Sequence, residues 1–148
     1  YHISKMNIKE ICEEVFLASS LKMKPEVKLV FDKELPSIRL KTDPQRVMQV
    51  ISNFVNNAIK FTEKGSITIS YKREGNYLRV NVQDTGIGIS EDDRKRIFER
   101  FIKINEFKQG TGLGLTISRT IIESLNGAIG VDSVKGSGST FWFTLPLE

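Results

Sequence analysis

The sequence has few of the features that mark a membrane protein, a disulfide framework or a nucleic-acid binder. Cys12 is the only cysteine among 148 residues, which excludes an internal disulfide and fits a reducing compartment. No apolar run approaches the ~18 residues of a membrane-spanning helix, and no signal peptide is visible. The net charge of +4 is modest and the basic residues are scattered, which disfavours nucleic acid or a membrane surface as a partner.

The length and composition of the chain are sufficient for one globular domain. Apolar residues make up 39% of the chain and charged residues 27%, which allows a real core inside an ordinary polar surface. The first residue is Tyr1 rather than Met, so we expect a piece of a longer protein. Residues 1–6 are too short to fold alone, and we interpret them as the tail of a preceding element, with the domain at 7–148.

Hydrophobic periodicity predicts helices and mostly antiparallel strands. We expect helices at 7–23 and 43–62, a short one near 90–98, a loop at 101–110, and a helix with apolar residues between 115 and 125. The expected strands are 27–31, a short one around 38–40, 66–73, 77–84, 128–132 and 139–145. This order predicts an α+β sandwich with helices on one face of the sheet.

The clearest helical pattern is the stretch 43–62. Asp43 suits the N-cap, and the proline after it suits the first helical position. Asn53, Asn57 and Lys60 stand at i, i+4 and i+7 along the flank of its apolar arc. Amide oxygens suit Mg²⁺ and an ammonium suits phosphate, so this flank could wall a metal–phosphate site. The alternative is a plain solvated stripe.

Three glycine-containing clusters follow the central helix. Asp84 ends a predicted strand, and glycines at 86 and 88 allow a backbone to approach a ligand; an ionised carboxylate suits an exocyclic amine such as that of adenine. The glycines of 110–114 open a helix, whose free N–H groups favour an anion. The third cluster, 136–141, would by itself indicate only a hairpin turn.

Taken together, these clusters resemble the catalytic, ATP-binding domain of histidine protein kinases over nearly the whole chain. Residues 53–62 resemble the N box, 84–88 the G1 box, 97–101 the F box, 110–115 the G2 box and 136–141 the G3 box, in the family's order. The resemblance implies a Bergerat ATP-binding fold, a two-layer sandwich of a mixed, mostly antiparallel sheet and three main helices.

The resemblance also implies roles for individual residues. Asn57 would coordinate Mg²⁺ with the support of Asn53, Lys60 would contact the phosphates, and Asp84 would hold the adenine amine. Lys103 would lie near the γ-phosphate, which makes Asn53, Lys60 and Lys103 the expected catalytic residues. The other expected nucleotide contacts are Gly86, Gly88, Ile89, Phe101, Gly110, Thr111, Gly112, Leu113, Gly114, Leu115 and Thr140.

Two features depart from the family pattern. The expected ATP lid, 101–110, is short and resembles the lids of hybrid two-component receptors. The phosphoacceptor helix is absent, because His2 is the only histidine and precedes Ile3 rather than an acidic residue. We therefore expect residues 1–6 to be the remnant of a lost dimerisation hairpin or a linker.

The function that the resemblance implies is transfer of the γ-phosphate of ATP, with Mg²⁺, to a histidine. That histidine would lie on a dimerisation domain of the same parent, and a response-regulator receiver domain would act downstream. By resemblance the domain would be cytoplasmic and its parent membrane-anchored, while this fragment would contact neither membrane nor nucleic acid.

Two other functions remain open. One is a hydrolytic ATPase on the same fold, like the gyrase, chaperone and mismatch-repair enzymes, whose pattern has a glutamate base four residues before the metal asparagine. Here that position is Asn53, which cannot take a proton at neutral pH. The other is a nucleotide-binding interaction module that has lost catalysis.

Overall fold

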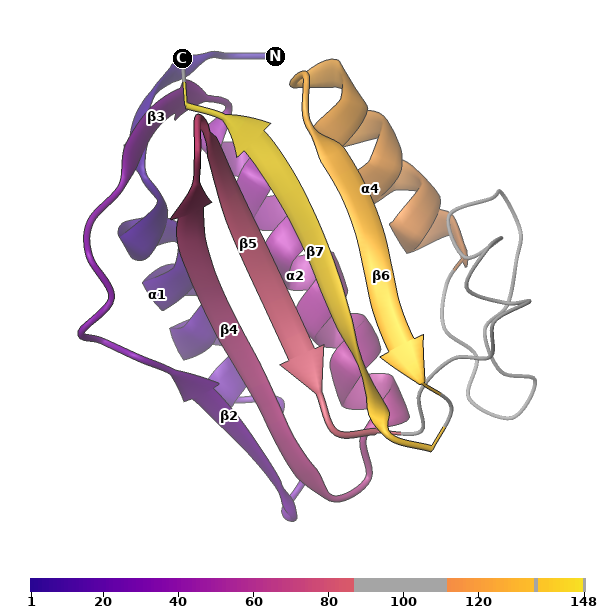
Figure 1. Ribbon diagram of the computed structural model, residues 1–148. Coiled ribbons are helices and arrows are strands. Elements are labelled where there is room, and N and C mark those ends of the chain that lie inside the picture. Colours follow the sequence, from indigo (N-terminus) through magenta and orange to yellow (C-terminus); the bar gives the residue numbers. More distant parts are fainter. Residues whose placement is uncertain (87–111, 135, 148) are drawn as a thin grey trace.

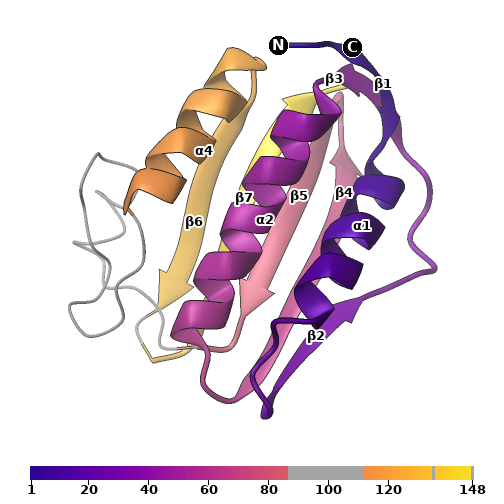
Figure 2. The same ribbon diagram turned by 180° about the vertical axis from the view of Figure 1, so that it is seen from behind.

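The computed structural model describes residues 1–86, 112–134 and 136–147, and these form two layers (Figure 1). One layer is a five-stranded sheet in the order β2–β4–β5–β7–β6; a separate small sheet pairs β1 with β3. Three helices of the described part lie side by side across one face of the larger sheet (Figure 2). In chain order the elements are β1 (Ser4–Asn7), α1 (Ile8–Ser20), β2 (Val27–Phe31), β3 (Arg39–Thr42), α2 (Pro44–Phe61), β4 (Gly65–Glu74), β5 (Tyr77–Asp84), α4 (Gly112–Ser124), β6 (Ala128–Val134) and β7 (Gly138–Pro146).

The sheet is mixed and mostly antiparallel, as the sequence led us to expect. Only the β2–β4 pair is parallel among the five strands, and β4, β5, β7 and β6 run antiparallel to their neighbours. A tight turn through Gly75, at φ +58°, joins β4 to β5 as a hairpin. The α+β sandwich with helices on one face is therefore confirmed.

The core lies between the helices and the sheet, and α2 occupies its centre. Asp43 caps this helix, since its carboxylate accepts the N–H groups of Gln45 and Arg46 at 3.1 and 3.2 Å. The ring of Phe54 packs against two rings of β7, Phe141 and Phe143, with centroids 5.4 and 6.1 Å away. The fully buried apolar side chains include Ile8, Val47, Val50, Ile51, Phe54, Val55, Ile67, Ile69, Leu78, Val80, Val82, Leu115, Ile122 and Phe143.

Cys12 belongs to this core. It is fully buried on the inner face of α1, and burial, with a smaller effect from Glu13, raises the pKa of its thiol to about 12. The thiol therefore stays protonated at neutral pH and acts as a small apolar group.

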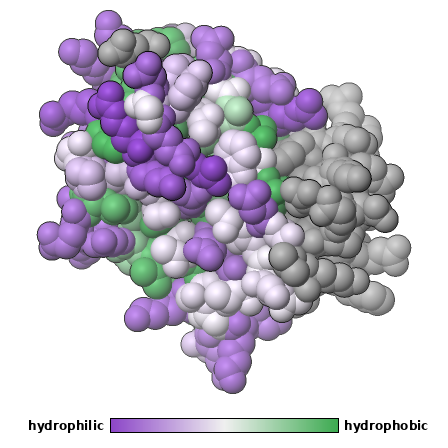
Figure 3. Space-filling view, in the orientation of Figure 1, coloured by the Kyte–Doolittle hydropathy of each residue, from purple (hydrophilic) through white to green (hydrophobic). Residues whose placement is uncertain are grey.

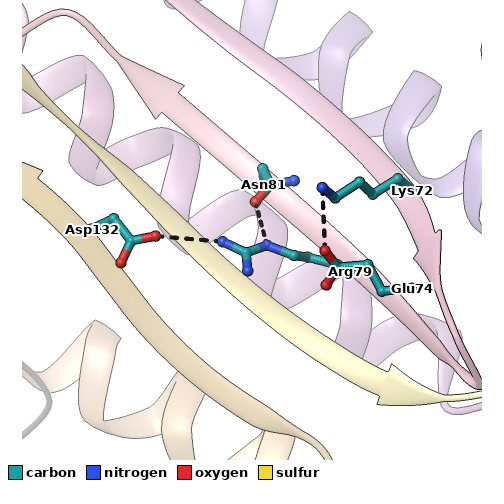
Figure 4. A network of polar contacts seen from close by, with 5 residues as sticks. All are labelled: Lys72, Glu74, Arg79, Asn81 and Asp132. Carbon is teal, nitrogen blue, oxygen red and sulfur yellow. Dashed lines mark hydrogen bonds and ion pairs between the residues drawn. The ribbon is translucent and has the colours of Figure 1, made fainter.

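Within the described residues, no helix covers the other face of the sheet. Figure 3 shows mostly hydrophilic and intermediate residues over it. Figure 4 shows the polar contacts at its centre, where the Arg79 guanidinium donates to Asn81 at 3.0 Å and meets Asp132 at 3.5 Å. The same guanidinium lies 4.7 Å from the ring centre of Trp142. An antiparallel sheet commonly keeps one solvated face of this kind, where exposed ion pairs stabilise little.

The N-terminal residues differ from the expectation. We predicted no strand before residue 7, yet β1 pairs antiparallel with β3, Met6 is buried, and the backbone N–H of His2 donates to Asp43 at 2.9 Å. The partner strand is more than 30 residues away in sequence, so no local pattern indicates it. Helix α1 also ends at Ser20 instead of residue 23.

Two expectations concern residues that the structure does not describe. The short helix near 90–98 and the loop at 101–110 both fall in the gap between 86 and 112. Among the helices that are described, none is both long and apolar enough to cross a membrane.

Candidate functional site

Asn57 provides the most informative atom of the candidate site. Its side chain is 4% exposed, and its Nδ2 group donates to the backbone carbonyl of Asn53 at 2.9 Å. Its Oδ1 atom is buried and has no hydrogen-bond partner in the described structure. A buried acceptor without a partner costs about 1–3 kcal/mol, so the site favours a ligand that supplies a donor or a cation. A carboxamide oxygen is one of the ligands that Mg²⁺ accepts, so this residue fits the expected metal.

Asn53 connects the two helices that flank the site. Its side-chain Nδ2 donates to the hydroxyl of Ser118, 3.2 Å away on α4, and Ser118 is fully buried. Lys60, the third residue of the predicted flank, is exposed in the last turn of α2. The helix thus places a buried amide, a half-buried amide and an exposed ammonium along one edge.

Asp84 ends β5 and is 4% exposed. Its Oδ1 accepts the backbone N–H of Gly86 at 2.8 Å, and the N–H of Ser139 on β7 also donates to the carboxylate. Burial raises the pKa of Asp84 above its ordinary value, although these two N–H groups act in the opposite direction. A buried carboxylate oriented in this way is suited to accept a hydrogen bond from a ligand amine.

Gly86 brings this end of β5 against α2. A Cβ at Gly86 would collide with the carbonyl oxygen of Phe61 and would lie 2.9 Å from the Thr62 hydroxyl. Phe61 is one helical turn beyond Asn57. The close packing at this glycine therefore brings the end of β5, with Asp84, to the same end of α2 that carries Asn57.

Ser139 lies beside Asp84 at the candidate site, although the sequence did not single it out. It is 6% exposed and stands directly opposite Asp84 in the β5–β7 register. Thr140, which we had expected to contact the nucleotide, is opposite Gln83 and points to the open face of the sheet with it. The inward positions of this strand can be identified in the sequence from its apolar residues Phe141, Phe143 and Leu145. Ser139 is an even number of residues away from them and therefore faces inward as well.

The remaining predicted residues divide into two groups. Gly88, Ile89, Phe101, Lys103, Gly110 and Thr111 lie outside the described residues. The others fall at the start of α4, which begins at Gly112 and runs through Leu113 and Gly114, as the glycine pattern predicted. Leu115 is fully buried in the core, so its side chain contributes to packing.

Comparison with known proteins gives the same assignment as the motifs. Residues 42–148 match a family described as histidine kinase-, DNA gyrase B-, and HSP90-like ATPase. Sensor protein GacS of Pseudomonas syringae pv. syringae is 44% identical over 119 residues, which cover 74% of this chain and 13% of GacS. Sensor histidine kinase RcsC of Escherichia coli (strain K12) is 43% identical over 114 residues, which cover 74% of this chain and 12% of RcsC. The chain thus spans about an eighth of these relatives, 13% and 12% of their lengths.

Solved structures extend the match to the whole fold. The nucleotide-free catalytic domain of histidine kinase ThkA superposes with a TM-score of 0.87 and 31% identity, covering 99% of both chains. Full-length ShkA in complex with AMPPNP gives a TM-score of 0.82 and 32% identity, covering 97% of this chain and 31% of ShkA. The chain therefore belongs to the histidine kinase-, DNA gyrase B- and HSP90-like ATPase family, as a catalytic domain of the histidine kinase type.

Proposed function

We propose that this domain binds ATP together with Mg²⁺ and donates the γ-phosphate to a histidine on a separate dimerisation domain of its parent protein. The observation that carries the proposal is the buried Oδ1 of Asn57, an acceptor without a partner in the described residues. Asp84, a buried carboxylate, lies toward the same end of α2. A nucleotide with a bound cation would satisfy both groups at once.

Each of three side chains would contact a different part of the ligand. The Asp84 carboxylate would accept the exocyclic amine of adenine, and Asn57 Oδ1 would be a metal ligand. Lys60 is exposed on a flexible stem, so its ammonium could reach a phosphate oxygen. The metal ion, when bound, would neutralise charge on the phosphates, and phosphoryl transfer depends mainly on such charge stabilisation and on positioning. The relative ShkA has been solved in complex with AMPPNP, which supports nucleotide binding as the function of this domain.

Asn53 argues for transfer to a side chain over hydrolysis. A carboxamide cannot act as the base that activates water, and here its Nδ2 donates to Ser118. Domains that use this fold for hydrolysis need such a base. We therefore prefer kinase activity to ATPase activity, and both to a catalytically silent nucleotide-binding module.

We further propose a response-regulator receiver domain as the downstream partner and the cytoplasm as the location. The relative ThkA has been solved in complex with the response regulator protein TrrA, at 28% identity and a TM-score of 0.79 to this chain. GacS and RcsC are named as sensor proteins.

The test is incubation with Mg²⁺ and γ-labelled ATP, with and without a separately produced dimerisation hairpin of the parent. We expect acid-labile label on the hairpin and none on the isolated chain, since the His2 side chain is exposed and a nucleophile must be held in line with the γ-phosphate. Label on the isolated chain that disappears in His2→Ala would contradict the proposal. Rapid phosphate release without labelled hairpin would favour the hydrolytic alternative.

A further inference from the structure

Ser139 is the cross-strand neighbour of a buried carboxylate, and its hydroxyl makes a hydrogen bond on the other side. Asp84 and Ser139 are directly opposite each other on β5 and β7, and the backbone N–H of Ser139 donates to the Asp84 carboxylate. The Ser139 hydroxyl is instead 2.8 Å from the hydroxyl of Ser133 on β6. In the strand order β5–β7–β6, Ser133 and Asp84 are on opposite sides of Ser139.

The direction of the hydrogens follows from counting donors. The Ser133 hydroxyl donates to the carbonyl oxygen of Gly138 at 2.9 Å. Each hydroxyl has one hydrogen and can accept at two lone pairs. The assignment that serves both contacts is therefore Ser133 donating to Gly138 and Ser139 donating to Ser133. The hydrogen of Ser139 then points away from Asp84, and its lone pairs remain on the side of the carboxylate.

This arrangement is unusual for a serine beside a carboxylate. A hydroxyl in this position would ordinarily donate to the charged group, because charge-assisted hydrogen bonds are about twice as strong as neutral ones. Here two residues that each offer an acceptor are cross-strand neighbours at a site with little exposure, 4% for Asp84 and 6% for Ser139. Two adjacent acceptors are complementary to a ligand group with two hydrogens to give, such as an exocyclic amine.

We propose that Ser133 is a specificity-determining residue that acts through Ser139: by accepting the Ser139 hydroxyl hydrogen, it keeps this part of the nucleotide site free of donors. Adenine, which presents an amine, is then accepted, and guanine, which presents a carbonyl oxygen at the same position, is rejected. This inference rests on the proposed nucleotide-binding function and assigns a part of its base selectivity to a residue behind the site.

The test is the ratio of ATP to GTP affinity in Ser133→Ala, measured by calorimetric titration of the whole chain. Without Ser133 the Ser139 hydroxyl can rotate into the site and donate to Asp84 or, with GTP bound, to the guanine carbonyl, so we expect the preference for ATP to fall about fivefold, the effect of one neutral hydrogen bond. Ser133→Thr keeps a hydroxyl and should keep the preference. Ser20→Ala, which removes an exposed hydroxyl bonded within α1, is the matched control.

The outcomes separate this inference from the proposed function. If the wild-type chain binds neither nucleotide, the proposed function is wrong and the inference is wrong with it. If the wild-type chain prefers ATP but Ser133→Ala weakens both nucleotides equally, or changes neither, Ser133 has only a structural role and the inference alone is overturned. Should Ser133→Ala not fold, Ser133→Cys replaces it, since a thiol is a weak acceptor of similar size, and the same fall in preference is expected.

Discussion

The side-chain nitrogen of Asn57 donates to the backbone carbonyl of Asn53, 2.9 Å away and one turn earlier in α2. This bond fixes the orientation of the amide, because the nitrogen is engaged and the oxygen must face the other way. The oxygen is buried and finds no partner among the residues that the structure describes. Asn57 thus presents an acceptor alone to whatever binds there.

Removal of that acceptor should abolish the effect of Mg²⁺ on nucleotide binding. Asn57→Ala is expected to bind ATP with the same affinity in Mg²⁺ and in a chelator, and to keep the binding that comes from adenine. Asn56→Ala is the matched control, because Asn56 is exposed on the same helix and its side-chain oxygen accepts from Lys22 at 2.9 Å. Calorimetric titrations of the three proteins would decide, and a full Mg²⁺ enhancement in Asn57→Ala would place the metal ligand elsewhere.

Base selectivity should depend on Asp84. Guanine would place a carbonyl oxygen against this carboxylate, and an unpaired buried acceptor costs about 1–3 kcal/mol, so we expect GTP to bind at least tenfold more weakly than ATP. Asp84→Asn should weaken ATP and reduce the difference, since an amide can also donate. Asp132→Asn, an exposed carboxylate on the open face, should change neither affinity. Equal ATP and GTP affinities in the wild-type chain would remove Asp84 from its assigned role.

The same carboxylate should give the stability of the fold a definite pH dependence. Burial raises the folded-state pKa of Asp84 above the ordinary 3.8, so between these two values the folded chain holds more protons than the unfolded chain. The contribution of Asp84 to the free energy of unfolding is therefore greatest at low pH and declines as the pH rises through this interval.

The variant Asp84→Asn isolates that contribution. Its stability relative to wild type should rise as the pH increases from about 4 and then level off above the folded pKa, because the amide does not titrate. Urea unfolding of both proteins at a series of pH values measures the difference directly. A difference that stays constant with pH, or that falls, would mean that the folded pKa of Asp84 is not raised.

Asp43, the N-cap of α2, should contribute more to stability than most single polar side chains do. Asp43 is 4% exposed and accepts three backbone N–H groups, from His2, Gln45 and Arg46. Asp43→Ala should lower the free energy of unfolding by about 1–2 kcal/mol, the upper part of the range for an N-cap. Asp32→Ala, which removes an exposed turn carboxylate bonded to Glu34, should cost less. Equal losses in urea unfolding would contradict the role given to the cap.

The sequence predicted most of the fold because local signals determine most of its elements. Helix α2 has its cap, its proline and its apolar arc within one stretch, and β4 and β5 are joined by a short turn through Gly75. Strand β1 has no comparable signal, because its hydrogen bonds come from β3, beyond α1 and β2 in the chain. Pairing over such a separation cannot be read from a four-residue segment.

The candidate site was predictable in its residue types and less so in its contacts. Asn57 and Asp84 follow from their motifs, but the contact of Asn53 with Ser118 joins residues 65 apart in sequence. The inward position of Ser139 and the outward position of Thr140 depend on the phase of β7, which only the apolar positions of that strand reveal. The hydroxyl pair of Ser133 and Ser139 depends on the register of β6 against β7, which sequence does not supply.

The most direct test of the account is a calorimetric titration of the unmodified chain with ATP, once with Mg²⁺ and once with a chelator, followed by GTP under the first condition. We expect ATP to bind with one-to-one stoichiometry, more tightly with Mg²⁺ than without, and at least tenfold more tightly than GTP. Absence of ATP binding in Mg²⁺, or equal binding of ATP and GTP, would contradict the account of this site.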